Sequence, residues 1–250
     1  MGVPGTRVVN LHSRILETLQ GTPTFSRHTP IAGANVPIIL LNHPVIQHNL
    51  AQARNRTTDS ETFAKMIDRI SSLMVYEVSR DLPSHPVSLE TPLETTQGNC
   101  LSRPLVLVPI LRAGLGMVQG FKALLPDAMV AHLGLYRDEQ TLEPVVYYKK
   151  LPRDLQNRDL IVLDPMLATG GTAVAALHFL KERRPATIRL VCVLAAPEGV
   201  KHVEQAHPDV PIYGAALDRE LNSVGYILPG LGDAGDRIFG TTGTDDGDDA

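Results

Sequence analysis

The residues best suited to chemistry lie between Ile161 and Glu182, where the chain reads IVLDPMLATGGTAVAALHFLKE. An apolar, strand-like run ends at Asp164, then Thr169 to Thr172 form a glycine-rich turn, and a helix follows. The backbone N–H groups of such a turn and the helix N-terminus favour a phosphate dianion. Asp164 is placed to accept hydrogen bonds from ribose hydroxyls; the alternative is a helix-capping turn with an incidental acid. No Walker lysine is present, which argues against ATP or GTP hydrolysis on this loop.

A second glycine-rich stretch, PGLGDAG from Pro229 to Gly235, has the spacing G-x-G-x-x-G. In a dinucleotide-binding fold these glycines follow an early strand and open the helix of a βαβ unit. Ala250 follows too soon for such a unit to be completed, so we expect a different use of this flexible backbone. Neither H-E-x-x-H nor G-x-S-x-G occurs, so zinc-protease and esterase motifs are absent from the sequence.

Composition favours a small-molecule partner. The 250 residues carry a formal net charge of -4, which provides no general attraction for nucleic acid or an anionic membrane. Two distant cysteines, Cys100 and Cys192, suit reduced thiols in a cytosolic protein. No apolar segment approaches the roughly 18 residues that span a bilayer. We therefore expect a cytoplasmic protein without a membrane or nucleic-acid partner.

Short apolar runs from Pro104 onward must position the glycine-rich turns. Runs without alternation are typical of strands buried on both faces, which predicts an α/β fold with a mostly parallel twisted sheet flanked by helices. The predicted strands are LVLVPIL, AMVAHLGLY, LIVLDPM, IRLVCVLAA and PIYGAAL. Ligands of such sheets bind beyond the carboxyl ends of the strands, where both turns around Gly114 and Gly170 are expected. Residues 136–152 predict a β-hairpin that projects from the sheet.

Other segments complete the organisation. A long amphipathic helix is predicted behind a Ser60 cap, with its stripe in the core or at a subunit interface. The stripe consists of Phe63, Met66, Ile67, Ile70, Leu73, Met74 and Val78. We expect residues 1–35 to form a flexible arm, residues 36–242 one domain, and residues 243–250 a disordered acidic tail.

Three of these stretches carry a family resemblance. VLDPMLATGGT resembles the phosphoribosyl-diphosphate (PRPP) loop of type I phosphoribosyltransferases, and with LVPILRAGLGM and GYILPGLGDAGDRIFGT it resembles the uracil phosphoribosyltransferases. The similarity runs from about Asn35 to Thr242. It implies the type I phosphoribosyltransferase fold and a pentosyltransferase that converts uracil and PRPP to UMP and diphosphate in pyrimidine salvage. It also implies that the hairpin is a mobile hood, whose closure would exclude water from the reaction.

The resemblance assigns roles to individual residues. It implies catalytic roles for Arg112, Arg137, Asp164 and Asp233. It implies that PRPP is bound by Arg112, Arg137, Asp164, Pro165, Met166, Leu167, Ala168, Thr169, Gly170, Gly171, Thr172 and Asp233. It implies that uracil is read by Ile227, Gly232, Asp233 and Ala234, mainly through their backbone groups. Most relatives carry two adjacent acids where this chain has an Asp-Pro pair, so we expect no protein metal site and Mg²⁺ carried mainly by the diphosphate of PRPP.

The resemblance further implies a homodimer or homotetramer, with GTP as a candidate effector because GTP activates some members. Two alternatives remain open at this point. One is an RNA-binding regulator on the same fold that senses uridine nucleotides, and the other is a uracil-binding relative with little turnover. A basic face would mark the regulator, and measured turnover would exclude the inactive relative.

Overall fold

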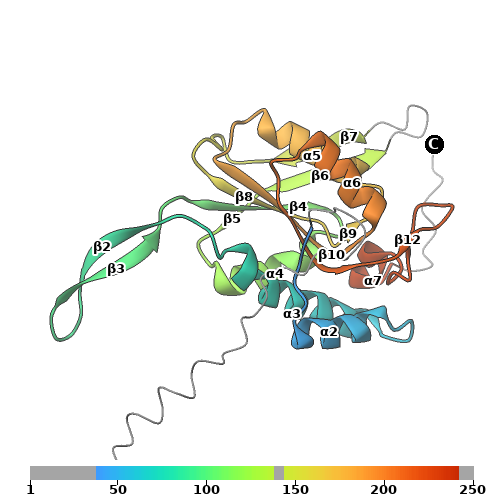
Figure 1. Cartoon of the computed structure of the whole chain (residues 1–250), viewed down its shortest axis with the longest axis horizontal. Helices are drawn as coiled ribbons and strands as arrows, with labels where there is room; N and C mark the ends of the chain where they lie inside the picture. Colours follow the sequence, from blue (N-terminus) through green and yellow to red (C-terminus); the bar gives the residue numbers. More distant parts are fainter. Residues whose placement is uncertain (1–37, 138–143, 242–250) are drawn as a thin grey trace, which may run out of the picture. The chain divides into compact units, whose positions relative to one another are not determined.

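A computed structural model of the chain describes residues 38–137 and 144–241 (Figure 1). The predicted arm of residues 1–35, the tail of residues 243–250 and the tip of the predicted hood lie outside the described residues. Within the described ranges, no helix combines the length and the apolar character needed to cross a membrane.

The central element is a nine-stranded sheet with the strand order β1-β11-β10-β8-β4-β6-β7, in which β5 pairs with β4 and β9 with β10. Its strands are β1 (Ile38–Leu40), β4 (Leu105–Leu111), β5 (Met129–Val130), β6 (His132–Arg137), β7 (Pro144–Lys150), β8 (Asp159–Leu163), β9 (Met166–Leu167), β10 (Thr187–Ala195) and β11 (Ile212–Leu217). All paired strands run parallel except β6 and β7. The prediction of a mostly parallel α/β sheet is confirmed.

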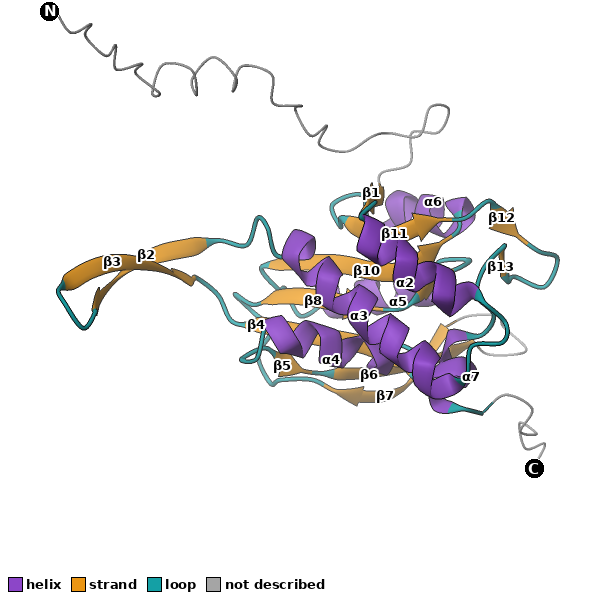
Figure 2. Cartoon of the chain, turned by 90° about the horizontal axis from the view of Figure 1, so that it is seen from below, coloured by secondary structure: helices purple, strands orange, loops and turns teal. Residues whose placement is uncertain are grey.

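Helices cover both faces of this sheet (Figures 1 and 2). The helices are α2 (Pro44–Arg54), α3 (Ser60–Val78), α4 (Leu115–Leu124), α5 (Gly171–Lys181), α6 (Pro197–Ala206) and α7 (Ala234–Phe239). Leu107 and Ile161 belong to the core formed with α2, α3 and α4, whereas Val106 and Leu160 belong to the core formed with α5 and α6. Because alternate side chains enter different cores, the central strands need apolar residues at every position.

Helix α3 has the predicted apolar stripe, which is buried in the core except for the partly buried Leu73. The predicted Ser60 cap is wrong by one residue. Asp59 is the N-cap, and its carboxylate accepts a hydrogen bond from the N–H of Thr62 at 2.7 Å. Both residue types are good caps, and the backbone here stays extended through Asp59, so Ser60 already lies inside the helix.

The predicted hairpin forms as the antiparallel pair β6 and β7, but β6 also pairs with β4, so the hairpin continues the main sheet at its edge. A different ribbon, of β2 (Ser84–Glu90) and β3 (Thr95–Leu101), forms a separate sheet that extends away from the main one (Figure 1). The sequence does not predict this ribbon. Its strands are polar, include Pro86 and Gly98, and are mostly exposed, so no apolar pattern marks them.

Candidate active site

Three segments distant in the sequence meet at the carboxyl ends of the central strands. They are the loop 111–114 after β4, the loop 164–170 after β8, and the segment 225–236 near the C-terminus. A Cβ added at Gly114 would lie 2.3 Å from the carbonyl oxygen of Leu163, so the loop after β4 packs backbone to backbone against the end of β8, where the second loop begins. Cβ positions built at Gly225 and Gly235 lie 3.8 Å from Thr169 Cγ2 and 3.7 Å from Ala113 Cβ, respectively. The structure thus brings the three predicted motifs together.

The predicted phosphate cradle contains a left-handed residue. Gly170 has φ +81° and is the N-cap of α5. A Cβ there would lie 2.7 Å from the carbonyl oxygen of Gly199 on α6, so both the conformation and the close approach require glycine. The first turn of α5, from Gly171, presents backbone N–H groups that have no partner within the helix. This geometry suits a phosphate at the helix N-terminus.

The rest of the predicted PRPP loop is anchored to neighbouring backbone. Met166 and Leu167 form β9 and pair with β10, and the carbonyl of Pro165 accepts hydrogen bonds from two N–H groups of β10. The N–H of Ala196 donates to the carbonyl of Leu167 at 2.9 Å. On the exposed side, the carbonyl of Thr169 lies 3.0 Å from His202 Nδ1. The cradle is therefore held by the start of α6 as well as by the sheet. Ala168 and Thr172 complete the loop, at its centre and in the first turn of α5.

Asp164 follows the last residue of β8. One carboxylate oxygen accepts a hydrogen bond from the N–H of Met166 at 3.3 Å, and the backbone N–H of Asp164 donates to the carbonyl of Val191. Burial raises the pKa of the Asp164 carboxyl to about 6. An acid that is costly to keep ionised beside a phosphate cradle is typical of a ligand-binding position.

Arg112 comes directly after β4. Its guanidinium donates a hydrogen bond to Asp236 on α7 at 3.1 Å, and its side chain is 57% exposed. The cationic head is thus held between the loop 111–114 and the C-terminal segment while it remains open to an anion. Arg137 is the last residue of β6, and its side chain lies outside the described part of the structure.

The predicted uracil-reading residues surround a tight turn. Ile227 is buried in the short strand β13 (Ile227–Leu228), which pairs with β12 (Glu220–Leu221). Gly232 has φ +82°, a conformation that favours glycine. Asp233 caps α7 by accepting a hydrogen bond from the N–H of Asp236 at 2.9 Å, and Ala234 is the first residue of that helix. The glycines follow β13, which pairs antiparallel with β12, so they do not lie in the parallel βαβ unit of a dinucleotide-binding fold.

Sequence reasoning missed residues that hold this turn. Arg54 and Asp218 form an ion pair that contacts the backbone of Gly230. Arg237 donates hydrogen bonds to the carbonyls of Leu231 and of residues at the end of α2, and it lies over the Phe63 ring with its guanidinium carbon 4.1 Å from the centroid. One signal was present: Asp218 directly follows a buried strand, as Asp164 does. Arginine positions gave no comparable signal.

Among the described residues, no group of three or more His, Cys, Asp or Glu side chains is arranged to hold a metal ion. Asp164 is the sole acidic residue of the loop 164–172. A single carboxylate can support a hydrated ion held by phosphates, but it cannot form a metal site by itself.

The matches to known proteins cover all three of these segments. A family model described as uracil phosphoribosyltransferase matches residues 40–241. The uracil phosphoribosyltransferase of Geobacillus kaustophilus (strain HTA426) is 54% identical over 205 residues, which cover 82% of this chain and 98% of that protein. The uracil phosphoribosyltransferase of Streptococcus agalactiae serotype III (strain NEM316) is 55% identical over 203 residues, covering 81% of this chain and 97% of that protein.

A solved structure, that of the AQ2163 protein from Aquifex aeolicus, has the same fold with a TM-score of 0.77. It is 39% identical in sequence, and the match covers 81% of this chain and 97% of that one. Family model, relatives and fold agree with the motifs and with the way the structure gathers them. The chain belongs to the uracil phosphoribosyltransferase family.

Proposed function

We propose that this chain is a pentosyltransferase that joins N1 of uracil to C1 of PRPP, with release of diphosphate and formation of UMP. The observation that carries the proposal is the meeting of a phosphate cradle at Gly170, a cation at Arg112 and a glycine-rich turn at Gly232 on one edge of the sheet. A new N1–C1 bond forms as the bond from C1 to the diphosphate oxygen breaks, and the proton on N1 passes to the departing diphosphate.

The proposed roles on the PRPP side follow the chemistry of each group. The cradle from Leu167 to Thr172 binds the 5′-phosphate through backbone N–H groups and hydroxyls. Asp164 accepts hydrogen bonds from ribose hydroxyls, while Arg112 and Arg137 stabilise the charge of the departing diphosphate. These groups favour a transition state in which the ribose is cationic and the leaving group gains negative charge. No strong protein base is required.

The proposed roles on the base side use peptide groups. Uracil presents alternating acceptors and donors along one edge, which complement backbone N–H and C=O groups. We assign this contact to Ile227, Gly232 and Ala234, with Asp233 on the side of the PRPP. Glycine at position 232 lets the main chain approach a flat ring closely.

Mg²⁺ is proposed to arrive on the diphosphate of PRPP. The ion would neutralise diphosphate charge, and Asp164 is the one carboxylate on the loop that could meet its hydration shell. This agrees with the Asp-Pro sequence at positions 164 and 165.

A homodimer or homotetramer is the proposed assembly. The β2–β3 ribbon supports it, because a two-stranded ribbon is marginally stable in water by itself and needs a surface to pack against. Large apolar side chains on this ribbon are exposed, including Leu89, Leu101 and Leu93, the last at 94%. GTP is retained as an effector to test. Light scattering with and without GTP would report the assembly and its response.

The decisive experiment is incubation of the chain with PRPP, Mg²⁺ and a panel of free bases, with detection of nucleoside monophosphates. We expect UMP from uracil and no product from adenine, guanine or hypoxanthine. Comparable turnover of a purine would refute the substrate assignment. Uracil binding without any product would instead support the inactive relative, and salt-sensitive RNA binding without product would support the regulator.

A further inference from the structure

The turn before Gly232 is held by two charged side chains that the proposed reaction does not use. The N–H of Gly230 donates to Asp218 Oδ2 at 2.9 Å, and the carbonyl oxygen of Gly230 accepts from Arg54 Nη1 at 2.8 Å. Both polar groups of one peptide position are therefore bound by side chains of other elements. The pair is called here the Arg54–Asp218 clamp.

The clamp is itself rigid. Arg54 makes two parallel hydrogen bonds to Asp218, of 2.7 Å and 2.5 Å, which is the bidentate geometry that arginine and carboxylate form best. The Asp218 side chain is 5% exposed and that of Arg54 is 24% exposed. Arg54 is the last residue of α2, and the N–H of Asp218 donates to the carbonyl of Ala195 at the end of β10. The clamp thus ties the turn to a helix end and to the main sheet.

The backbone of the turn is also closely packed around Gly230. This residue has φ +64°, and a Cβ there would lie 2.1 Å from the carbonyl oxygen of Ile227. The next carbonyl, of Leu231, accepts a hydrogen bond from Arg237 at 2.7 Å. Consecutive peptide positions between Ile227 and Gly232 are therefore oriented by arginines. A glycine-rich segment would otherwise sample many backbone conformations.

We infer that Arg54 and Asp218 are positioning residues for base recognition, which fix the peptide groups of the turn without being part of the PRPP site. This inference rests on the proposed function. Fixed dipoles discriminate between bases because a wrong base leaves buried polar groups unpaired. Loosening the turn should therefore raise the KM for uracil and reduce the preference for uracil over cytosine, while the KM for PRPP stays near that of the unmodified protein.

The test compares kinetic constants of Arg54→Met and Arg54→Lys with those of the unmodified chain. Arg54→Met removes the hydrogen bonds of Arg54 to Asp218 and to the carbonyl of Gly230. We expect the uracil KM to rise about tenfold or more, with a change below about threefold in the PRPP KM. Arg54→Lys keeps the charge but loses the planar fork, so it should give an intermediate uracil KM. Asp218→Asn should resemble Arg54→Met in direction, since Arg54 loses its charged partner and the second acceptor oxygen.

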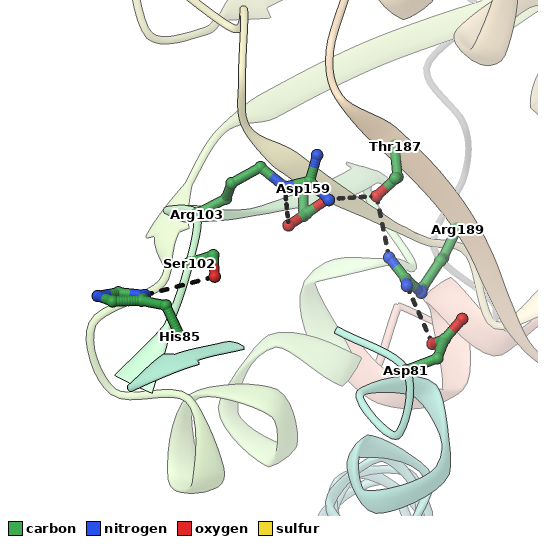
Figure 3. Close-up of polar contacts among 7 residues, drawn as sticks. All are labelled: Asp81, His85, Ser102, Arg103, Asp159, Thr187 and Arg189. Atoms are coloured by element: carbon green, nitrogen blue, oxygen red, sulfur yellow. Dashed lines mark hydrogen bonds and ion pairs between the residues drawn. The ribbon is translucent and has the colours of Figure 1, made fainter. Parts of the chain in front are cut away.

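The matched control is the ion pair of Arg103 and Asp159, in which Nε lies 3.2 Å from Oδ2 (Figure 3). Like the clamp, it joins a partly exposed arginine to a buried carboxylate, with side chains 32% and 2% exposed. Asp159 begins β8, at the opposite end of that strand from Asp164. Arg103→Met should lower the melting temperature without changing the uracil KM or base preference.

Defined results would overturn the inference. An unchanged uracil KM in Arg54→Met, parallel increases in the KM values of both substrates, or an equal effect of Arg103→Met would each refute a specific positioning role. Failure of the unmodified chain to form UMP would instead refute the proposed function. If Arg54→Met does not fold, the Arg54→Lys result decides by the same criteria.

Discussion

Arg112 Nη2 lies 3.1 Å from Asp236 Oδ1 across the site, although the two residues come from opposite parts of the domain. The same carboxylate oxygen of Asp236 accepts a hydrogen bond from the hydroxyl of Thr241 at 2.7 Å, and the N–H of Asp236 donates to Asp233. The arginine proposed for the diphosphate is thus connected to the helix that follows the turn proposed to read the base. Its exposed head remains available to a diphosphate that arrives in the site.

Arg112→Ala should weaken PRPP use and leave the fold intact. Loss of a charge-assisted hydrogen bond is worth about 1.5 to 3 kcal/mol, so the KM for PRPP should rise about tenfold to a hundredfold. The melting temperature should change little, because an exposed ion pair contributes below about 1 kcal/mol. Initial rates at limiting PRPP and a thermal melt would check both parts. Normal kinetics at limiting PRPP would remove Arg112 from the site.

Asp164→Asn should stabilise the fold in a pH-dependent way while it weakens the binding of PRPP. The pKa of Asp164 is raised by burial to about 6, above the ordinary 3.8, so the folded state retains a proton that the unfolded state releases. The acid therefore costs stability progressively as pH rises from about 4 to 6, and fully above that. The melting temperature of Asp164→Asn should match that of the unmodified chain near pH 4 and exceed it at pH 7 to 8. Binding of PRPP by the variant should nevertheless be weaker.

Thermal melts of both proteins across this pH range, without ligand, test the prediction. A difference in melting temperature that does not vary with pH would contradict the assigned cause. PRPP affinity equal to that of the unmodified chain would contradict the assigned role of the carboxylate.

Gly171→Ala is a probe of the cradle that spares the fold. Within 4 Å, a Cβ at Gly171 meets only Thr169 Oγ1, at 3.8 Å, and alanine favours the helix that starts there. The melting temperature should stay level or rise, while the KM for PRPP should increase because the methyl group occupies space beside the phosphate. Gly199→Ala is the contrast, since its Cβ would lie 2.3 Å from the carbonyl oxygen of Ala168 and should destabilise the chain. Unchanged PRPP kinetics in Gly171→Ala would place the phosphate elsewhere.

Gly232→Val and removal of residues 244–250 should have opposite consequences. At Gly232 a Cβ has room, with Arg237 Cδ 3.6 Å from its position, but φ is +82°. A branched residue in that conformation is strained by about 1 to 3 kcal/mol, so the turn should shift and uracil binding should be lost with PRPP binding largely kept. Residues 244–250 are acidic and lack an apolar anchor, so their removal should be neutral. Isothermal titration with both ligands would decide; normal uracil binding by Gly232→Val, or loss of binding by the truncated chain, would be the contrary result.

The sequence by itself determined the elements that depend on neighbouring residues. Wholly apolar runs predicted the parallel strands, the stripe from Phe63 to Val78 predicted α3, and the turn at Gly170 predicted a phosphate cradle at a strand end. These signals are local, because the pattern of apolar residues along a short stretch of sequence indicates a buried strand or an amphipathic helix. The family motifs then added the roles of residues such as Arg112.

Only the tertiary structure decided the contacts between distant segments. The pairing of Arg54 with Asp218, separated by 164 positions, depends on which helix end meets which strand end. The link from Arg112 to Asp236 spans 124 positions for the same reason. Polar side chains have no periodicity that identifies such partners, and the β2–β3 ribbon has no apolar pattern at all. The sequence therefore predicted which segments carry the chemistry, while packing decided which side chains hold those segments in place.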